Sequence, residues 1–142
     1  MRGSAIEQRI VLLTSSVRDG QVTHDTLRVA GFDCVGANDV DETIRLLDEG
    51  AAAVVVAQEA LTPESFGALV GHLEGQEPWS DLPVLFLSTA TSRGVGSTAD
   101  LAPLGNVTVL ERPLGKSTLV LAVRAALRTR RRQYASRAAL AE

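Results

Sequence analysis

The sequence has few of the residues that hold many small domains together by covalent or aromatic contacts. It contains one cysteine, Cys34, and only 4% aromatic residues. A single cysteine excludes an internal disulfide and a multi-cysteine zinc site, and the short apolar run around Cys34 favours a buried small hydrophobe over a reactive thiol. These features predict a reducing, cytoplasmic location and a core built from valine, leucine and alanine.

Long hydrophobic runs are missing as well. No stretch of 18 or more apolar residues occurs, so the sequence predicts neither a membrane segment nor a signal peptide. The 142 residues, 45% of them hydrophobic, suit one domain with a substantial core. Many aliphatic and few aromatic residues are typical of a parallel sheet covered by helices on both faces.

Acidic residues are absent between Arg124 and Arg137, a segment that holds six arginines. The rest of the chain has eight basic and 17 acidic residues, a net charge of −9. An acidic body of this kind argues against nucleic-acid binding, and no helix-turn-helix follows the arginines. No nucleic-acid partner is therefore predicted.

Five short apolar runs alternate with segments of helical pattern. Asp39, followed three residues later by Glu42, forms a capping-box pattern, and Thr62 before Pro63 marks another helix start. Residues 88–105 are rich in small residues, so any helix there is expected to be short. The predicted strands are 10–13, 32–35, 52–56, 83–87 and 107–110, and the predicted helices are 22–30, 40–49, one from residue 63 and one from about residue 114.

This alternation predicts an α/β fold in which right-handed crossovers connect parallel strands. We expect a three-layer sandwich with a five-stranded parallel sheet. The predicted organisation is an N-terminal extension at 1–8, a domain at 9–127, and a basic helical extension or linker at 128–142.

Two strings, PWSDLPVLFLSTA and VTVLERPL, resemble the fourth and fifth strands of the receiver domain of two-component response regulators. The resemblance covers residues 9 to about 130. It implies a flavodoxin-like sheet with strand order 2-1-3-4-5 and a site at the carboxyl ends of the strands.

The resemblance also implies a set of residues for phosphoryl transfer, and this chain departs from that set. Thr14 and Ser15 stand where the family has an acidic pair that helps to hold Mg²⁺, and no Asp or Glu occurs between residues 8 and 18. Ala57 or Glu59 takes the place of the phosphoacceptor aspartate, depending on the alignment. No aspartate occurs between Asp48 and Asp81.

Three other positions of the implied site are retained or keep the charge without the compact ammonium group of lysine. Ser88 matches the hydroxyl residue that senses the phosphoryl group, and Arg112 stands where the family has lysine. The resemblance implies a cis peptide bond before Pro113. Because Mg²⁺ binding requires several oxygen ligands, the sequence predicts no metal site and no cofactor.

Glu59 has two interpretations that the sequence leaves open. Its carboxylate lies near Arg112 and imitates a permanently modified aspartate, or it is a solvated side chain in a loop.

These observations predict a receiver-like signalling module that is not phosphorylated and is not an enzyme. Its partners would be a second copy of the chain, a histidine kinase or another signalling domain, and it would form the N-terminal regulatory domain of a sensor kinase or another two-component protein. The expected contact face consists of the segment before residue 107, the strand at 107–110 and the last helix. The interface residues predicted on that helix are Leu119, Val123, Leu127 and Tyr134.

Two alternative functions remain. One is a stand-alone regulator that is phosphorylated atypically at Glu59 or a serine, and the other is a small-ligand binder on a flavodoxin-like fold. The tail is also open to two interpretations, because Leu127, Tyr134, Ala138 and Ala141 have the spacing of a short coiled coil or simply belong to the basic end of a helix.

Overall fold

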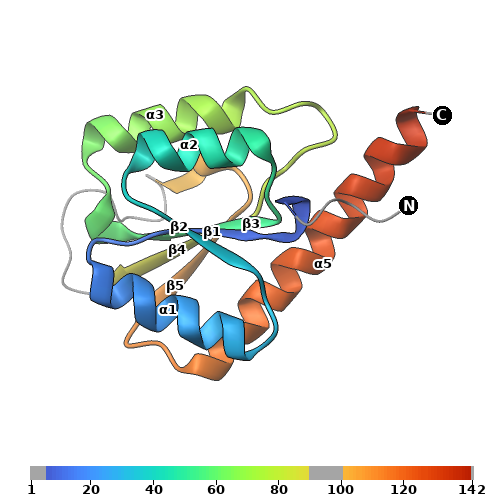
Figure 1. Ribbon diagram of the computed structural model, residues 1–142. Coiled ribbons are helices and arrows are strands. Elements are labelled where there is room, and N and C mark those ends of the chain that lie inside the picture. The colour runs from blue at the N-terminus through green and yellow to red at the C-terminus, as the bar shows by residue number, and fades with distance from the viewer. Residues whose placement is uncertain (1–5, 90–100, 142) are drawn as a thin grey trace.

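The computed structural model describes residues 6–89 and 101–141. Within them, a parallel sheet of five strands has the order β2-β1-β3-β4-β5. Figure 1 shows α2 and α3 on one face of this sheet and α1 and α5 on the other. The predicted three-layer, flavodoxin-like fold and its strand order are confirmed.

The strands agree with the predicted ones to within two residues at each end. The strand β1 (Ile10–Leu13) matches the prediction, whereas β2 (Cys34–Ala37) begins and ends two residues later. The other strands are β3 (Ala53–Ala57), β4 (Val84–Thr89) and β5 (Val107–Arg112).

Alternate strand residues pack on opposite faces of the sheet. Val11, Val54 and Phe86 contribute to the core beneath α2 and α3, whereas Ile10 and Val55 contribute to the core beneath α1 and α5. The inner strands β1 and β3 are buried along their whole length, which is why their sequences are continuous apolar runs.

The helices α2 (Val40–Glu49) and α3 (Pro63–Glu74) begin at the predicted caps. Asp39 accepts a hydrogen bond from the backbone N–H of Glu42, and Thr62 and Ser65 form a reciprocal capping box. The Glu42 carboxylate accepts from the backbone N–H of Asn38, one residue before the cap, so the predicted box at this helix closes at a different residue.

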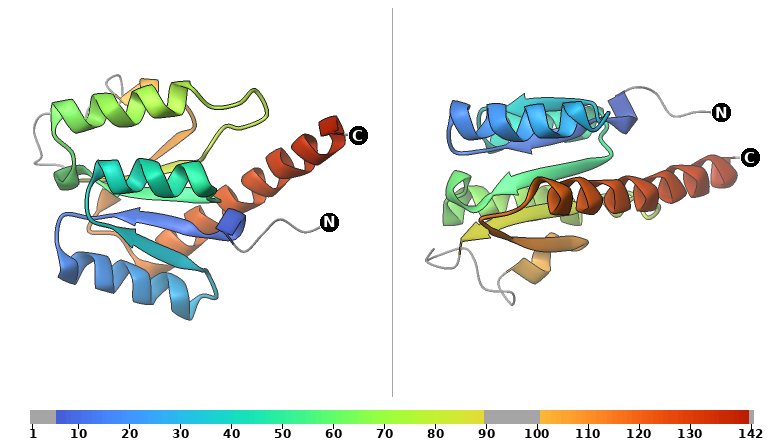
Figure 2. Two further views of the ribbon diagram at one scale, coloured as in Figure 1. Left: turned by 45° about the horizontal axis from the view of Figure 1, so that its top comes forward. Right: turned by 90° about the horizontal axis from the view of Figure 1, so that it is seen from below.

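The other two helices differ from the prediction in their start and in their extent. The helix α1 (Val17–Val29) begins five residues before the predicted start. The helix α5 (Lys116–Ala141) runs for 26 residues without interruption, and its far end extends beyond the sheet (Figure 2). The short helix considered within 88–105 lies mostly outside the described residues, which show a 3₁₀ turn at Ala102–Leu104.

Candidate functional site

The carboxyl ends of the parallel strands bring several predicted site residues to one edge of the sheet. Ala57 is the last residue of β3 and lies beside Leu87 of β4 in the strand register. Arg112 is the last residue of β5 and lies beside Thr89 of β4. Thr14 follows the end of β1.

The end of β3 carries a methyl group and no carboxylate. Ala57 is 2% exposed, and Glu59 lies two residues further along, in the 3₁₀ turn Gln58–Ala60. The structure therefore places the two candidate acceptor residues in different settings, one buried at the strand end and the other on the turn that follows.

Glu59 and Arg112 form an ion pair in which the guanidinium donates a hydrogen bond to the carboxylate. The same Arg112 nitrogen donates to the backbone oxygen of Leu87 at 3.3 Å. The pair thus connects the turn after β3 with the ends of β4 and β5. Of the two interpretations of Glu59, the structure has the carboxylate paired with Arg112.

The ion pair favours the ionised form of Glu59. The hydrogen bond from Arg112 lowers the pKa of the Glu59 carboxyl group below its usual range, against the opposing effect of partial burial. The carboxylate is therefore ionised at neutral pH. The Arg112 Nε is buried and has no hydrogen-bond partner within the described part of the chain. The peptide bond between Arg112 and Pro113 is cis, as the resemblance implied.

Thr14 and Ser15 occupy the turn between β1 and α1. The Thr14 hydroxyl donates to the backbone oxygen of Ser16 at 3.2 Å, whereas Ser15 is exposed. A Cβ atom at Gly20 would lie 2.7 Å from the Thr14 Oγ1, so α1 approaches this turn too closely for a larger residue. No carboxylate replaces the missing acidic pair on this turn.

A cavity of about 340 Å³ lies between this edge of the sheet, the middle of α1 and the start of α5. Thr14, Ala57, Arg112 and Pro113 line it, together with Lys116 at the start of α5. Ser15, Glu59 and Ser88 are not among its lining residues, and Ser88 is buried. The cavity therefore offers cations and hydroxyl groups without a lining carboxylate.

Metal-binding groups do not gather at this edge. Among the described residues, no cluster of three or more His, Cys, Asp or Glu side chains is placed to hold a metal ion. Burial raises the pKa of the Cys34 thiol to about 11, with a smaller contribution from Asp33. The thiol is therefore protonated at neutral pH and is a poor nucleophile or ligand. Within the same residues, no helix combines the length and hydropathy needed to cross a bilayer.

The residues predicted to form an interface on the last helix face the inside of the domain. Leu119, Val123 and Leu127 are buried beneath the sheet in the core shared with α1. The Tyr134 hydroxyl donates to the backbone oxygen of Ala51, just before β3, at 2.9 Å. The prediction was wrong for the three buried residues, because the apolar stripe of α5 is used to cover its own sheet.

The basic tail continues this inward-facing stripe with polar residues. Arg130 is 6% exposed, and it donates to the backbone oxygen of Ala51 at 3.0 Å and to the Ser80 hydroxyl at 2.8 Å. Its guanidinium lies against the rings of Trp79 and Tyr134.

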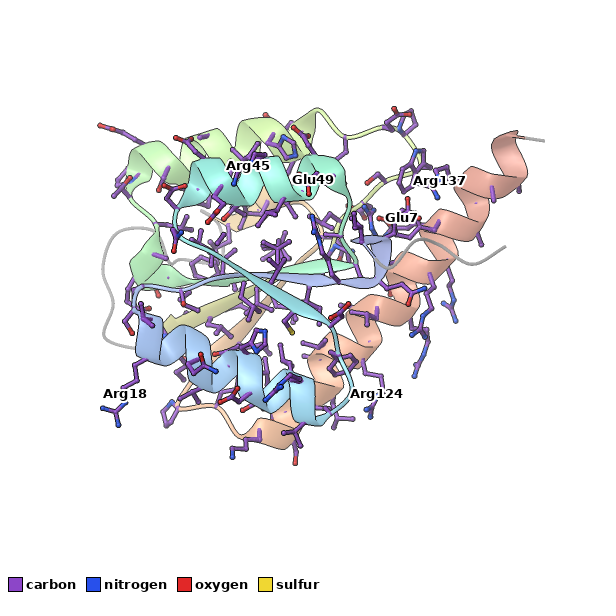
Figure 3. The ribbon with its side chains drawn as sticks, viewed as in Figure 1. Glu7, Arg18, Arg45, Glu49, Arg124 and Arg137 are labelled. Atoms are coloured by element: carbon purple, nitrogen blue, oxygen red, sulfur yellow. The ribbon has the colours of Figure 1, made fainter. Side chains whose placement is uncertain are left out.

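Two turns beyond Arg130 along α5, Arg137 forms an ion pair with Glu7 (Figure 3). Both nitrogens of the guanidinium donate to the carboxylate, at 2.6 and 3.1 Å. The predicted boundaries at residues 8 and 128 therefore divide segments that pack together. The sequence does contain the helical spacing of this inward-facing stripe, at positions 119, 123, 126, 130, 134 and 137. Because positions 130 and 137 are arginines, an apolar pattern does not identify them as part of it.

Neither a protein-family model nor a curated protein matches the sequence. Solved structures are similar. A sensor protein from Polaromonas sp. has a TM-score of 0.66 and 18% identity, with 86% of this chain and 97% of that chain covered. The chemotaxis protein CheY4 from Vibrio cholerae has a TM-score of 0.69 and 18% identity, with 84% and 98% covered.

NtrX from Brucella abortus, solved in complex with ADP, has a TM-score of 0.71 and 18% identity. The match covers 90% of this chain but only 28% of the NtrX chain. Other similar structures carry the description response regulator receiver protein, among them one from Sinorhizobium medicae with a TM-score of 0.63 and 19% identity. Identities this low establish the architecture and not the activity. The chain has the fold of response regulator receiver domains.

Proposed function

We propose that this chain is a receiver-like signalling module that works by binding partner proteins and is not phosphorylated by the mechanism of receiver domains. The observation that carries the proposal is the position of Ala57. It is the last residue of β3 and is buried against the sheet edge. A methyl group there cannot accept a phosphoryl group.

The missing acceptor coincides with a missing cation site. Phosphoryl transfer relies on metal ions to neutralise the charge of the transferring group, and Mg²⁺ is usually held through carboxylates. At this edge Thr14 and Ser15 carry hydroxyl groups, and the nearby carboxylate of Glu59 is already paired with Arg112. Acceptor and metal ligands are lacking together, so we assign no catalytic residue.

The ion pair between Glu59 and Arg112 takes the place of a switchable contact. It joins the turn after β3 to the end of β5 without any modification of the chain. A charge-assisted hydrogen bond of this kind favours one arrangement of the two segments. The pair therefore biases the proposed module toward one arrangement of these segments, as a permanently modified aspartate would.

The proposed setting is a two-component protein in which this domain contacts a second copy, a histidine kinase or another signalling domain. The fold shared with a sensor protein and with receiver domains supports this setting. On the predicted contact face, β5 is the edge strand of the sheet and exposes Val109. The segment before β5 falls largely outside the described residues. Cytoplasmic location stays a prediction, for which Cys34 in its reduced form is the basis.

The test is incubation of the chain with acetyl phosphate and Mg²⁺, followed by intact-mass measurement, with a working receiver domain as positive control. We expect no added phosphoryl group, and no heat when Mg²⁺ is titrated into the chain in a calorimeter. A stable adduct would refute the proposal. An adduct that disappears in Glu59→Gln would establish atypical phosphorylation at that carboxylate instead.

The small-ligand alternative is favoured by the 340 Å³ cavity, which is within the size range of ligand pockets. Arg112 and Lys116 give it positive charge, and Thr14, Thr23 and Thr26 supply hydroxyl groups. A thermal-shift series with nucleotides and flavins tests it. A concentration-dependent rise in melting temperature that is lost in Lys116→Ala would support a ligand site, and unchanged melting would exclude these two classes of ligand.

A further inference from the structure

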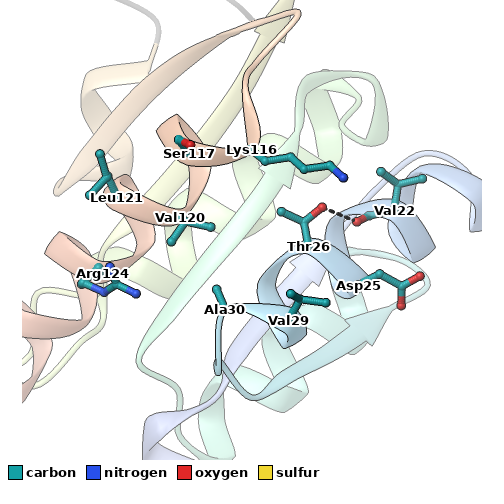
Figure 4. A pocket seen from close by; sticks show the side chains of 10 residues that line it. All are labelled: Val22, Asp25, Thr26, Val29, Ala30, Lys116, Ser117, Val120, Leu121 and Arg124. Atoms are coloured by element: carbon teal, nitrogen blue, oxygen red, sulfur yellow. Dashed lines mark hydrogen bonds between the residues drawn. The ribbon is translucent and has the colours of Figure 1, made fainter.

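A second hollow on the surface, which we call the α1–α5 groove, lies between these two helices on the same face of the sheet. It has a volume of about 710 Å³. Val22 and Val29 of α1 line it on one side, and Val120 and Leu121 of α5 line it on the other (Figure 4). Val29 is 87% exposed and Leu121 is 62% exposed. Large exposed aliphatic side chains that converge on one hollow mark a surface that another molecule covers.

Positive charge borders this groove along α5. Lys116 and Arg124 lie at the two ends of the α5 wall (Figure 4). Beyond the groove, Arg128, Arg131 and Arg132 are exposed on the same side of the helix, because residues four, seven and eight positions apart share a helical face.

These arginines, 124, 128, 131 and 132, form what we call the arginine ridge. None of the four forms a salt bridge within the described residues, although Arg124 lies over the Phe32 ring. At the rise of an α-helix, the ridge spans about 12 Å.

We infer that the α1–α5 groove binds an amphipathic helix of a partner protein, with the apolar stripe of that helix in the groove and its acidic side chains against the arginine ridge. This inference rests on the proposed function, namely that the chain works by binding partners. Two facing helices with aliphatic walls fit the helix-in-groove mode of recognition, in which residues at helical spacing serve as anchors.

The charge pattern selects an acidic partner. Four unpaired guanidiniums along one side of a helix repel a basic segment and attract an acidic one, which raises the association rate and makes it salt-dependent. The only carboxylate that lines the groove among the described residues, Asp25, already accepts a hydrogen bond from Gln21 at 2.8 Å. The groove thus presents apolar surface in its middle and cations on its α5 side.

Other occupants fit less well. Nucleic acid would meet a groove whose middle is aliphatic, next to a body whose remaining residues carry a net charge of −9. An anionic membrane would meet the same acidic body, and a flat surface cannot fill a hollow between two helices. A second copy that docked through its own α1 would bring the exposed Arg18 and Arg28 of that helix, which do not complement the ridge.

The experiment uses the full chain and a fluorescein-labelled synthetic helix of about 18 residues, long enough to form helix in isolation. Leucines are placed at helical spacing and glutamates on the flanking positions. A matched peptide has lysine in place of each glutamate. Fluorescence anisotropy should show binding of the glutamate peptide that weakens as salt increases, and at least about tenfold weaker binding of the lysine peptide.

Two pairs of variants locate the site. Val29→Ser in the groove is compared with Val17→Ser, a valine of the same helix that is 90% exposed and does not line the groove. Arg128→Glu on the ridge is compared with Arg45→Glu, an exposed arginine on α2, on the opposite face of the sheet (Figure 3). Each first variant should lower affinity about tenfold and each control less than about twofold.

Equal binding of the two peptides, or equal effects of site and control variants, would overturn the inference. Tighter binding to a DNA duplex or to vesicles of anionic lipid than to the glutamate peptide, lost in Arg128→Glu, would overturn it in favour of a polyanion surface. Failure here is separable from failure of the proposed function. A chain that fails to bind the peptide and still carries no phosphoryl group refutes only the groove, whereas a phosphorylated chain that binds the peptide refutes only the proposed function.

Discussion

Replacing Arg130 with alanine tests whether the end of α5 belongs to the domain. The guanidinium donates to the backbone oxygen of Ala51, to Ser80 Oγ and to Gln133 Oε1 at 2.7–3.0 Å, and it stacks on the Trp79 and Tyr134 rings. Hydrogen bonds from a charged donor contribute about 1.5–3 kcal/mol each. Desolvation opposes them, as the lowered pKa of Arg130 indicates.

The partners of Arg130 keep other hydrogen bonds after the substitution, which limits the loss. Ala51 still accepts from the Tyr134 hydroxyl, and Ser80 still donates to Gln76. We therefore expect Arg130→Ala to lower the free energy of unfolding by about 3 kcal/mol, the upper end of the range typical of single substitutions. With a slope of about 1.5 kcal/mol per molar urea, the midpoint falls by about 2 M.

The assay is urea unfolding followed both by circular dichroism and by the fluorescence of Trp79, the one tryptophan of the sequence. Trp79 lies in the cluster itself, so its signal reports the docking of α5, whereas circular dichroism reports all helices. Arg131→Ala is the matched control. Arg131 is exposed, and we expect its loss to change stability by less than about 0.5 kcal/mol. Equal stability of the two variants would refute the role assigned to Arg130.

Three further predictions concern local contacts. Because Arg112 lowers the pKa of Glu59, the pair stabilises the fold above the usual carboxyl pKa, and this stabilisation is lost as the pH falls through the lowered pKa. Glu59→Gln should therefore lower the free energy of unfolding by at most about 1 kcal/mol at pH 7 and leave it unchanged near pH 2, measured by denaturation at both pH values. Gly20→Ala should raise the free energy of unfolding by the full helix-propensity difference of about 1 kcal/mol only in a Thr14→Ala background, where the new Cβ no longer clashes with the Thr14 hydroxyl. Additive effects of the two substitutions in a double-mutant cycle would contradict this close approach. Asp39→Ala should lower the free energy of unfolding by about 1 kcal/mol through loss of the α2 cap, and an unchanged urea midpoint would refute the capping role.

The strands and two helix starts could be predicted because local chemistry decides them. Continuous aliphatic runs such as Val54–Val56 occur where a strand is buried on both faces. Asp39 and Thr62 satisfy free backbone N–H groups that every helix has at its start. These signals depend only on neighbours in the sequence, so one sequence is enough to find them.

The course of α1 could not be predicted from its apolar pattern. Val22 and Val29 are apolar residues of the predicted helix, yet both are exposed, and Leu27 is the buried residue. The polar first turn, which includes Arg18 and Gly20, has no apolar spacing to mark it as helix. A periodic pattern shows that a helix has an apolar side, but it does not show whether that side faces the domain or another molecule.

The contacts of the candidate site also depend on the fold and could not be predicted from local sequence alone. The sequence places Glu59 and Arg112 fifty-three residues apart, and only the parallel arrangement of β3 and β5 on either side of β4 brings them into contact. Arg130 and Arg137 belong to a run of like charges that is typical of a solvated surface. Helical geometry divides that run, since these two arginines face the body while those of the ridge face away.

Two contacts, one at each end of the parallel strands, stabilise the arrangement of this domain without any covalent modification of the chain. At the carboxyl edge the Glu59–Arg112 pair joins the turn after β3 to the end of β5. At the opposite edge Arg130 fastens α5 to Ala51, just before β3. A ligand shifts an equilibrium only by its different affinities for two states, and these contacts all favour the same state. The α1–α5 groove lies between the two edges, and the Arg130 contact helps to fix α5, which forms one of its walls. Binding there is therefore expected to proceed without rearrangement, so that such a domain acts through which partner it recruits and not through a change of its own shape.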